Sequence, residues 1–175
     1  AKGHLTTKSG QDIELLDLPG VYGDCGHSMD ERVTIDCIQG NLEGEARPDG
    51  LIIVMDAANI RTHLHNALQA KNHGLPVILV LNMMDIAARD GVEIDLVALE
   101  EEIGIPVVSS VAVRMNGRAA LLSRLNEWGA ELAEGRARLP KPETKDLAAL
   151  QKHARGISGR TVIAPRLQST SSRID

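Results

Sequence analysis

The sequence has almost no aromatic residues: its 175 residues include no phenylalanine, one tryptophan and one tyrosine. A core of this chain must therefore be built from aliphatic side chains and methionine, which bury readily. The two cysteines, Cys25 and Cys37, are too few and too isolated for a disulfide framework or a zinc site. These shortages exclude a disulfide-stabilised scaffold and favour a reducing compartment.

Basic residues are a minority, since 19 Lys and Arg stand against 24 Asp and Glu, for a net charge of -5. This balance argues against nucleic acid as a partner. No apolar run approaches the roughly 20 residues that a membrane-spanning helix needs. The most apolar runs, Leu51–Met55 and Pro76–Leu81, have the length of buried strands. No signal peptide is recognisable at the start of the sequence.

Strand and helix patterns alternate along the chain. Continuous apolar strands are predicted at 51–56 and 77–82, with a shorter strand at 106–110. Because strands buried on both faces alternate with helices, the predicted fold class is α/β, with a doubly wound, mostly parallel sheet. The strand at 12–17 alternates more and is expected at or near an edge. Helices are predicted at 29–39, 61–73, 96–103, 117–134 and 146–156.

Polar motifs follow the predicted strands, at the edge where an open parallel sheet binds ligands. The first strand leads into D-L-P-G, the second into Asp56, the third into N-M-M-D and the fourth into S-S-V-A. This order of motifs is typical of a guanine-nucleotide-binding GTPase domain. The candidate site residues are Asp17, Leu18, Pro19, Gly20, Asn82, Met83, Met84, Asp85, Ser110, Val111 and Ala112.

An Asp-x-x-Gly turn suits a sensor of a terminal phosphate. The carboxylate of Asp17 can hold the water shell of Mg²⁺, which gives up water reluctantly. Gly20 can present its backbone N–H to the γ-phosphate without a side chain in the way. Loss of that phosphate would release the loop 21–30, which is the expected switch. The alternative is an ordinary exit from a strand into a loop, since Asp, Pro and Gly all favour turns.

The N-x-x-D motif suits recognition of guanine. Guanine offers two adjacent N–H donors, and the carboxylate of Asp85 can accept both. Adenine lacks this donor pair and would leave a buried carboxylate unpaired. Asn82 would hold neighbouring loops, and a backbone N–H near Ala112 would reach the guanine carbonyl. The alternative is an α/β domain whose strands simply end on polar residues.

The sequence resembles the cytosolic GTPase domain of the ferrous-iron transport protein B (FeoB) family. The likeness is carried by D-L-P-G-V-Y with D-E-R-V-T-I-D-C-I, by V-M-D-A-A-N-I-R-T-H-L-H-N-A-L-Q and by V-L-N-M-M-D-I-A, and it runs from about residue 10 to residue 134. It implies binding of GTP and GDP with Mg²⁺, and slow GTP hydrolysis that controls Fe²⁺ transport. The implied location is the cytoplasmic side of the bacterial inner membrane. The implied partners are a guanine nucleotide and the membrane transport domain of the same full-length protein, which would also carry any homo-oligomer.

The sequence departs from this family in several places. A phosphate loop of the G-x-x-x-x-G-K-[ST] kind is expected before D-L-P-G and is absent, which suggests an N-terminally truncated P-loop GTPase without its phosphate-loop strand. GTP hydrolysis by this chain is therefore left open. Arg61 and His63 differ from the commoner family residues, and no water-orienting glutamine is evident after D-L-P-G.

The expected organisation is a GTPase (G) domain over 1–138, a linker over 139–145 and the start of a small helical domain with a polar tail over 146–175. Two prolines and mixed charges mark the linker. Two other functions remain open. One is a different GTPase, for example one serving ribosome assembly. The other is an interaction module that keeps the fold without binding nucleotide.

Overall fold

The computed structural model describes residues 1–6, 10, 12–19, 29–110 and 115–163. Its centre is a parallel sheet of three strands in the order β3–β4–β6. The strands are β3 (Leu51–Asp56), β4 (Val77–Asn82) and β6 (Val107–Ser109). The α/β class and the parallel pairing predicted from the sequence are confirmed. The central strand β4 is buried along almost its whole length, which explains its unbroken apolar sequence.

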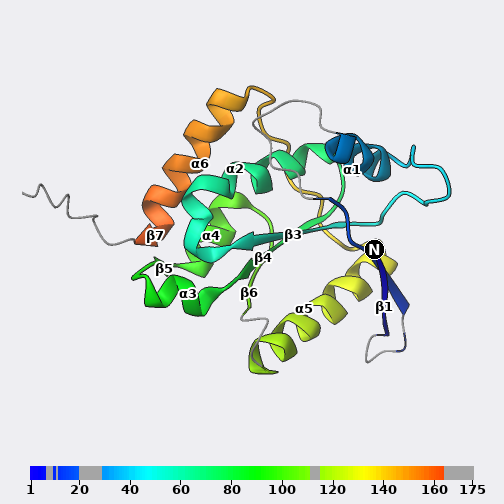
Figure 1. The fold of residues 1–175 in the computed structure, drawn as a ribbon, viewed down its shortest axis with the longest axis horizontal. Helices are drawn as coiled ribbons and strands as arrows, with labels where there is room; N and C mark the ends of the chain where they lie inside the picture. Colours follow the sequence, from blue (N-terminus) through cyan, green and yellow to red (C-terminus); the bar gives the residue numbers. More distant parts are fainter. Residues whose placement is uncertain (7–9, 11, 20–28, 111–114, 164–175) are drawn as a thin grey trace, which may run out of the picture.

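Helices cover both faces of this sheet (Figure 1). On one face lie α2 (Ile60–Ala70), α4 (Leu96–Ile103) and α6 (Leu147–Thr161), and on the other lies α5 (Met115–Ala133). The larger core fills the first face with aliphatic side chains, including Ile60, Leu64, Leu68, Leu99 and Ile103. The smaller core packs Trp128 and Leu125 of α5 against the sheet residues Ile78 and Val108.

The helices end where the sequence supplies a terminator. Gly74, after the 3₁₀ turn η2 (Lys71–His73), and Gly104, after α4, both adopt a left-handed backbone with φ near 69°. Only glycine takes this conformation without strain, and it closes helices for that reason. At the other end of α4, the side chain of Asp95 accepts a hydrogen bond from Ala98 N at 3.0 Å and caps the helix.

The strand predicted at 12–17 is not part of the described parallel sheet. It is β2 (Asp12–Leu16), which pairs antiparallel with β1 (Lys2–Thr6) in a two-stranded sheet of its own. The expected edge position is therefore not observed. Along one edge all five residues of β2 pair with β1, and along the other edge none of the described strands of the parallel sheet is paired with it. The remaining N-terminal element, α1 (Met29–Gln39), has the predicted bounds.

Several short elements were not expected from the sequence. The helix α3 (Met84–Arg89) follows β4 directly, and the two-residue strands β5 (Glu93–Ile94) and β7 (Val162–Ile163) pair with each other. The helix α6 extends to Thr161, beyond the predicted end at 156. Its buried face continues to that point, because Leu150, Ala154 and Ile157 belong to the larger core and Thr161 is also buried.

A buried ion pair fastens the segment before α6 to the rest of the fold. Lys71, whose side chain is 5% exposed, donates from Nζ to Glu143 Oε1 at 2.6 Å and to the carbonyl of Ile103 at 2.8 Å. Glu143 Oε2 lies 3.2 Å from His153 Nδ1 in α6. Burial alone would raise the pKa of the Glu143 carboxyl, but Lys71 and His153 outweigh it and hold that pKa below its ordinary value. The division into domains at this segment stays a prediction.

Candidate nucleotide-binding site

The parallel register brings three predicted strand ends to one edge of the sheet. Asp56 at the end of β3 is paired with Asn82 at the end of β4. Leu81 is paired with Ser109 at the end of β6, so Ser110 lies at the same edge. This edge is where parallel α/β sheets bind their ligands. The structure therefore places Asn82, Met83, Met84, Asp85 and Ser110 together, as the sequence predicted.

Asp56 caps a short turn at this edge of the sheet. Its Oδ1 accepts a hydrogen bond from Ala58 N at 2.9 Å, and its Oδ2 accepts one from Asn59 Nδ2 at 2.7 Å. Both oxygens are thereby engaged in capping the 3₁₀ turn η1 (Ala57–Asn59). These two hydrogen bonds give each carboxylate oxygen of Asp56 a partner within the protein, so its position does not require a ligand.

Met83 holds the N-x-x-D turn in an unusual backbone conformation. Its φ of 59° and ψ of 34° are left-handed, and among the described residues it is the sole non-glycine residue with a positive φ. Its carbonyl accepts hydrogen bonds from Ile86 N at 3.0 Å and Ala87 N at 3.1 Å, which start α3. Strain of this kind persists where the surroundings impose it and is common at functional sites.

Replacing Met83 by glycine is expected to stabilise the protein by about 0.5–1 kcal/mol. The left-handed conformation costs a side-chain-bearing residue about 1–2 kcal/mol, and the greater freedom of glycine in the unfolded chain offsets part of that gain. The methionine side chain is 43% exposed, so little packing is lost. Urea unfolding of Met83→Gly measures the difference. A lower free energy of unfolding would show that the side chain of Met83 contributes more than its backbone strain costs.

The carboxylate of Asp85 is half-buried, and only one of its two oxygens accepts a hydrogen bond within the described residues. Its Oδ1 accepts a hydrogen bond from Ile86 N at 3.1 Å. Its Oδ2 has no hydrogen-bond partner among the described residues. A carboxylate held at the first turn of a helix with an oxygen to spare can accept donors from a ligand. This is the chemistry that the N-x-x-D motif predicts.

Ser110 carries a buried hydroxyl beside this turn. The residue is 3% exposed, and its Oγ has no hydrogen-bond partner in the described part of the chain. Its backbone is well anchored, because Ser110 N donates to Leu81 O at 2.7 Å and its carbonyl accepts from Met84 N at 3.4 Å. Buried polar atoms are nearly always paired, so an unpaired hydroxyl at this edge is consistent with a ligand position. No pattern in the sequence predicts that this Oγ is enclosed.

The D-L-P-G segment is placed by β2 and α1. Asp17 N donates to Ala1 O at 2.7 Å, and the Ala1 amino group donates to Asp17 O at 2.9 Å. Thr34 Oγ1 in α1 donates to Pro19 O at 3.1 Å. The sequence did not predict the contact of Thr34, which joins residues 15 positions apart. Gly20, Val111, Ala112 and most of the switch loop 21–30 lie outside the described residues.

Few side chains among the described residues are available to hold Mg²⁺. Asp17 is exposed, and the described residues contain no group of three or more His, Cys, Asp or Glu side chains that would hold a metal ion. Mg²⁺ is commonly bound through one or two carboxylates, retained waters and the phosphates of a nucleotide. A single accessible carboxylate fits an outer-sphere contact of this kind, and it does not fit a metal site made by protein alone.

Comparison with known proteins identifies the family. The family model described as ferrous iron transport protein B matches residues 1–125. The chain belongs to the ferrous iron transport protein B family. The resemblance to FeoB proposed from the sequence is thereby confirmed. The Fe(2+) transporter FeoB of Salmonella typhimurium is 40% identical over 124 residues, which cover 69% of this chain and 15% of that protein. The chain thus spans about one seventh of the length of this FeoB relative.

Solved FeoB structures share the fold. The cytosolic domain of the T. maritima FeoB iron transporter in its GMPPNP form superposes with a TM-score of 0.72 at 22% identity, over 93% of this chain and 84% of that one. An S. thermophilus NFeoB mutant bound to GDP superposes with a TM-score of 0.61 at 28% identity, over 79% of this chain and 49% of that one. The α/β fold of the chain is that of a FeoB G domain. No helix in the described ranges combines the length and apolar character needed to cross a bilayer.

Proposed function

We propose that the chain is the guanine-nucleotide-binding, regulatory domain of a bacterial ferrous-iron transporter. In this role it binds GTP and GDP, and slow GTP hydrolysis in the complete domain controls Fe²⁺ transport. The observation that carries the proposal is the carboxylate of Asp85, close to the end of the central strand in a FeoB-family chain, whose Oδ2 has no hydrogen-bond partner among the described residues. The GMPPNP and GDP forms of related FeoB domains support it.

Asp85 would read the base. Its carboxylate accepts the ring N–H and the exocyclic amine of guanine, and both of its oxygens are acceptors only. Asn82 ends the strand that leads into the turn, and Ser110, after the neighbouring strand, accepts a hydrogen bond from Met84 N in the turn. An adenine base presents an acceptor where guanine presents its ring N–H, so it leaves the carboxylate without its donor pair. Preference for guanine over adenine follows from this arrangement.

Asp17 would act on the phosphate side. Mg²⁺ bound with the nucleotide would neutralise phosphate charge. The exposed carboxylate of Asp17 can orient waters of that ion, and the link from Thr34 to Pro19 fixes the start of the turn. Gly20, with the loop that follows, would sense the γ-phosphate through its backbone N–H. The candidate contacts at Leu18, Met84, Val111 and Ala112 would complete the nucleotide site.

The partner of this domain would be the membrane transport domain of the same full-length protein. The relative from S. typhimurium is about seven times longer than the matched region and is a Fe(2+) transporter. The proposed location of the domain is the cytoplasmic side of the bacterial inner membrane. Assembly into a homo-oligomer would run through the full-length transporter.

The proposal is tested by comparing GTP with ATP. In an NMR titration of the ¹⁵N-labelled chain, GTP is expected to shift the amide signals of Asn82–Asp85 and Ser110 and to bind at least about tenfold more tightly than ATP. Absolute affinity is expected to be weak, because the sequence contains no G-x-x-x-x-G-K-[ST] phosphate loop. Equal shifts with the two nucleotides would contradict guanine recognition. No response to either would favour an interaction module that keeps the fold without binding nucleotide.

A further inference from the structure

The charge of the chain is divided unevenly along the sequence. The chain as a whole is acidic, with a net charge of -5. The segment 136–160 is an exception, because it holds seven basic residues and only two acidic ones, Glu143 and Asp146. A charge asymmetry of this size within one chain indicates an anionic partner for the basic part.

Both acidic side chains of this segment are engaged in contacts of their own. Glu143 pairs with the buried ammonium of Lys71 at 2.6 Å. The carboxylate of Asp146 accepts a hydrogen bond from Ala148 N at 2.9 Å and caps α6. These two carboxylates therefore do little to neutralise the exposed basic side chains around them.

Five of the seven basic side chains have no acidic partner among the described residues. The other two are Arg136, which pairs with Glu134, and Arg160, which pairs with Glu102. The five unpaired side chains are all exposed, and we call them the basic surface: Arg138, Lys141, Lys145, Lys152 and Arg155.

The basic surface is formed by α6 and the segment that precedes it. The contact of Glu143 with His153, at 3.2 Å, holds this segment beside α6. Lys152 and Arg155 are three positions apart and share one face of the helix, while the opposite face enters the larger core. The helix α6 lies at the outer edge of the molecule, across the parallel sheet from α5 (Figure 1). The charged face is therefore directed away from the protein.

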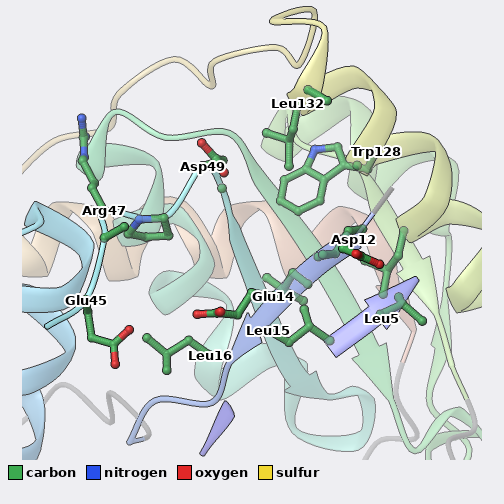
Figure 2. A pocket seen from close by; sticks show the side chains of 18 residues that line it. Leu5, Asp12, Glu14, Leu15, Leu16, Glu45, Arg47, Asp49, Trp128 and Leu132 are labelled. Atoms are coloured by element: carbon green, nitrogen blue, oxygen red, sulfur yellow. The ribbon is translucent and has the colours of Figure 1, made fainter. Parts of the chain in front are cut away.

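A group of acidic side chains lies at a different part of the fold. Asp12, Glu14, Glu45 and Asp49 line a cavity between the β1–β2 hairpin and α5 (Figure 2). In Figure 1 the hairpin lies at the right and α6 at the left. Charges of opposite sign are thus separated across the molecule. A separation of this kind orients a protein with its basic side toward an anionic surface.

Two exposed leucines stand among the basic residues. Leu139 follows Arg138 directly and is 61% exposed. Leu147, two positions after Lys145, is 42% exposed. Surfaces that combine lysine, arginine and leucine bind at the boundary between lipid headgroups and acyl chains. The pattern therefore fits a lipid surface.

Nucleic acid fits this surface less well. Single-stranded nucleic acid stacks its bases on aromatic side chains. Among the described residues the sole Trp, Tyr or Phe is Trp128, which is 6% exposed and points into the cavity beside the β1–β2 hairpin (Figure 2). The basic surface thus offers charge and aliphatic side chains without a stacking platform.

We propose that the basic surface docks on the anionic lipid headgroups of a membrane. Its lysine and arginine side chains contact lipid phosphates, and Leu139 and Leu147 enter the headgroup region. The inference rests on the proposed function for the identity of this membrane, which is the bacterial inner membrane seen from the cytoplasmic side. The lipid contact itself requires no nucleotide.

Lipid docking leaves the candidate nucleotide site open. The pair of Glu143 with Lys71 ties the basic surface to η2, which precedes the first residue of β4. Asp85 follows the other end of the same strand. The start of α6 and the base-reading turn therefore lie toward opposite ends of β4, and lipid binding can be measured separately from nucleotide binding.

The test measures co-sedimentation of the chain with vesicles in the absence of nucleotide. One set of vesicles contains phosphatidylcholine alone, and the other an equal mixture of phosphatidylcholine and anionic phosphatidylglycerol. We expect the neutral vesicles to bind at least about tenfold more weakly. Binding to the anionic vesicles is expected to fall as the salt concentration rises from roughly 0.05 to 0.5 M. Equal binding to both, or to neither, would overturn lipid docking without touching guanine recognition.

Charge-matched variants locate the binding surface. One basic side chain near an anionic membrane contributes about fivefold in affinity, so Lys152→Gln with Arg155→Gln is expected to weaken binding about 20-fold. Arg32→Gln with Arg89→Gln removes the same charge from exposed positions of α1 and α3. This control is expected to change binding by less than about twofold, because screening limits distant charges. Equal losses in the two double variants would overturn the assignment to α6.

Leu139→Gln with Leu147→Gln separates lipid from other anionic partners. It is expected to weaken binding to the anionic vesicles by about fivefold or more, because the apolar contribution is lost while the charge is kept. Added single-stranded RNA is expected to leave the chain on the vesicles. Release by RNA, or no effect of the leucine substitutions, would overturn the lipid assignment. So would a concentration-dependent dimer, formed without vesicles, that Lys152→Gln with Arg155→Gln abolishes.

Discussion

Lys71→Met is expected to lower the free energy of unfolding by about 3 kcal/mol, at the lower end of the range for breaking a buried ion pair. The Lys71 ammonium donates to two acceptors, Glu143 Oε1 at 2.6 Å and Ile103 O at 2.8 Å. Its removal leaves the Glu143 carboxylate, whose side chain is 15% exposed, without its main partner. Methionine has a similar length, so the loss reports the missing charge rather than a cavity. Urea unfolding at neutral pH measures it.

Two further variants show whether the loss belongs to the ion pair. Lys152→Met removes a lysine from the exposed surface of α6 and is expected to change stability by less than about 0.5 kcal/mol. The double variant Lys71→Met with Glu143→Leu is expected to recover much of the stability, because no unpaired charge is then left buried. A loss below about 1 kcal/mol for Lys71→Met, or no recovery in the double variant, would contradict the assigned role of the pair.

The elements with strong local signals were predictable from the sequence. The strands at 51–56 and 77–82 and the helices at 29–39 and 96–103 have the observed bounds. In each strand an unbroken apolar run is long enough to cross the sheet, and Gly104 ends the last of these helices. Where burial, periodicity and a terminator agree, sequence alone places an element.

The elements that depend on distant partners were not predictable. The strands β5 and β7 have two residues each and exist through their pairing across 68 residues of sequence, as in Ile94 with Val162. The hairpin of β1 and β2 forms a two-stranded sheet of its own among the described strands, and the sequence patterns did not predict its strand β1. Strand partners are set by contacts that no local pattern contains.

In the candidate site, too, some features were predictable from local sequence and others were not. Asn82, Asp85 and Ser110 were placed correctly at one edge, because parallel strands that end on polar residues must deliver them there. The left-handed backbone of Met83 and the enclosed hydroxyl of Ser110 had no local signal. Both follow from how the ends of β4 and β6 meet, which is a property of the folded sheet.

Asp85→Asn is expected to weaken GTP binding by about tenfold or more, since a buried mismatch of this kind costs about 1–3 kcal/mol. The substitution keeps the shape of the side chain but replaces one acceptor oxygen by an NH₂ donor. That donor faces the exocyclic amine of guanine, donor against donor. Xanthine carries a carbonyl at the position of this amine, so the same substitution creates a complementary pair with XTP.

The contacts of Asp85 in the fold allow Asp85→Asn to test base recognition without disturbing the structure. The bond from Ile86 N to Oδ1 starts from the backbone and can be kept by the amide oxygen of asparagine. The turn is also held by the bonds from Ile86 N and Ala87 N to Met83 O. We therefore expect the fold and stability of Asp85→Asn to stay close to those of the unmodified chain. Asp90→Asn, in the exposed turn after α3, is the matched control. It is expected to leave the affinities for GTP and XTP unchanged.

The most direct measurement of guanine recognition is a paired NMR titration of the unmodified chain and Asp85→Asn, each with GTP and with XTP. The ratio of the two dissociation constants removes contributions from the phosphates, which are identical in the two nucleotides. The unmodified chain is expected to bind GTP more tightly than XTP, and Asp85→Asn is expected to reverse this order. A ratio that is the same in both proteins would contradict a base-reading role for Asp85 and, with it, the assignment of a guanine nucleotide to this site.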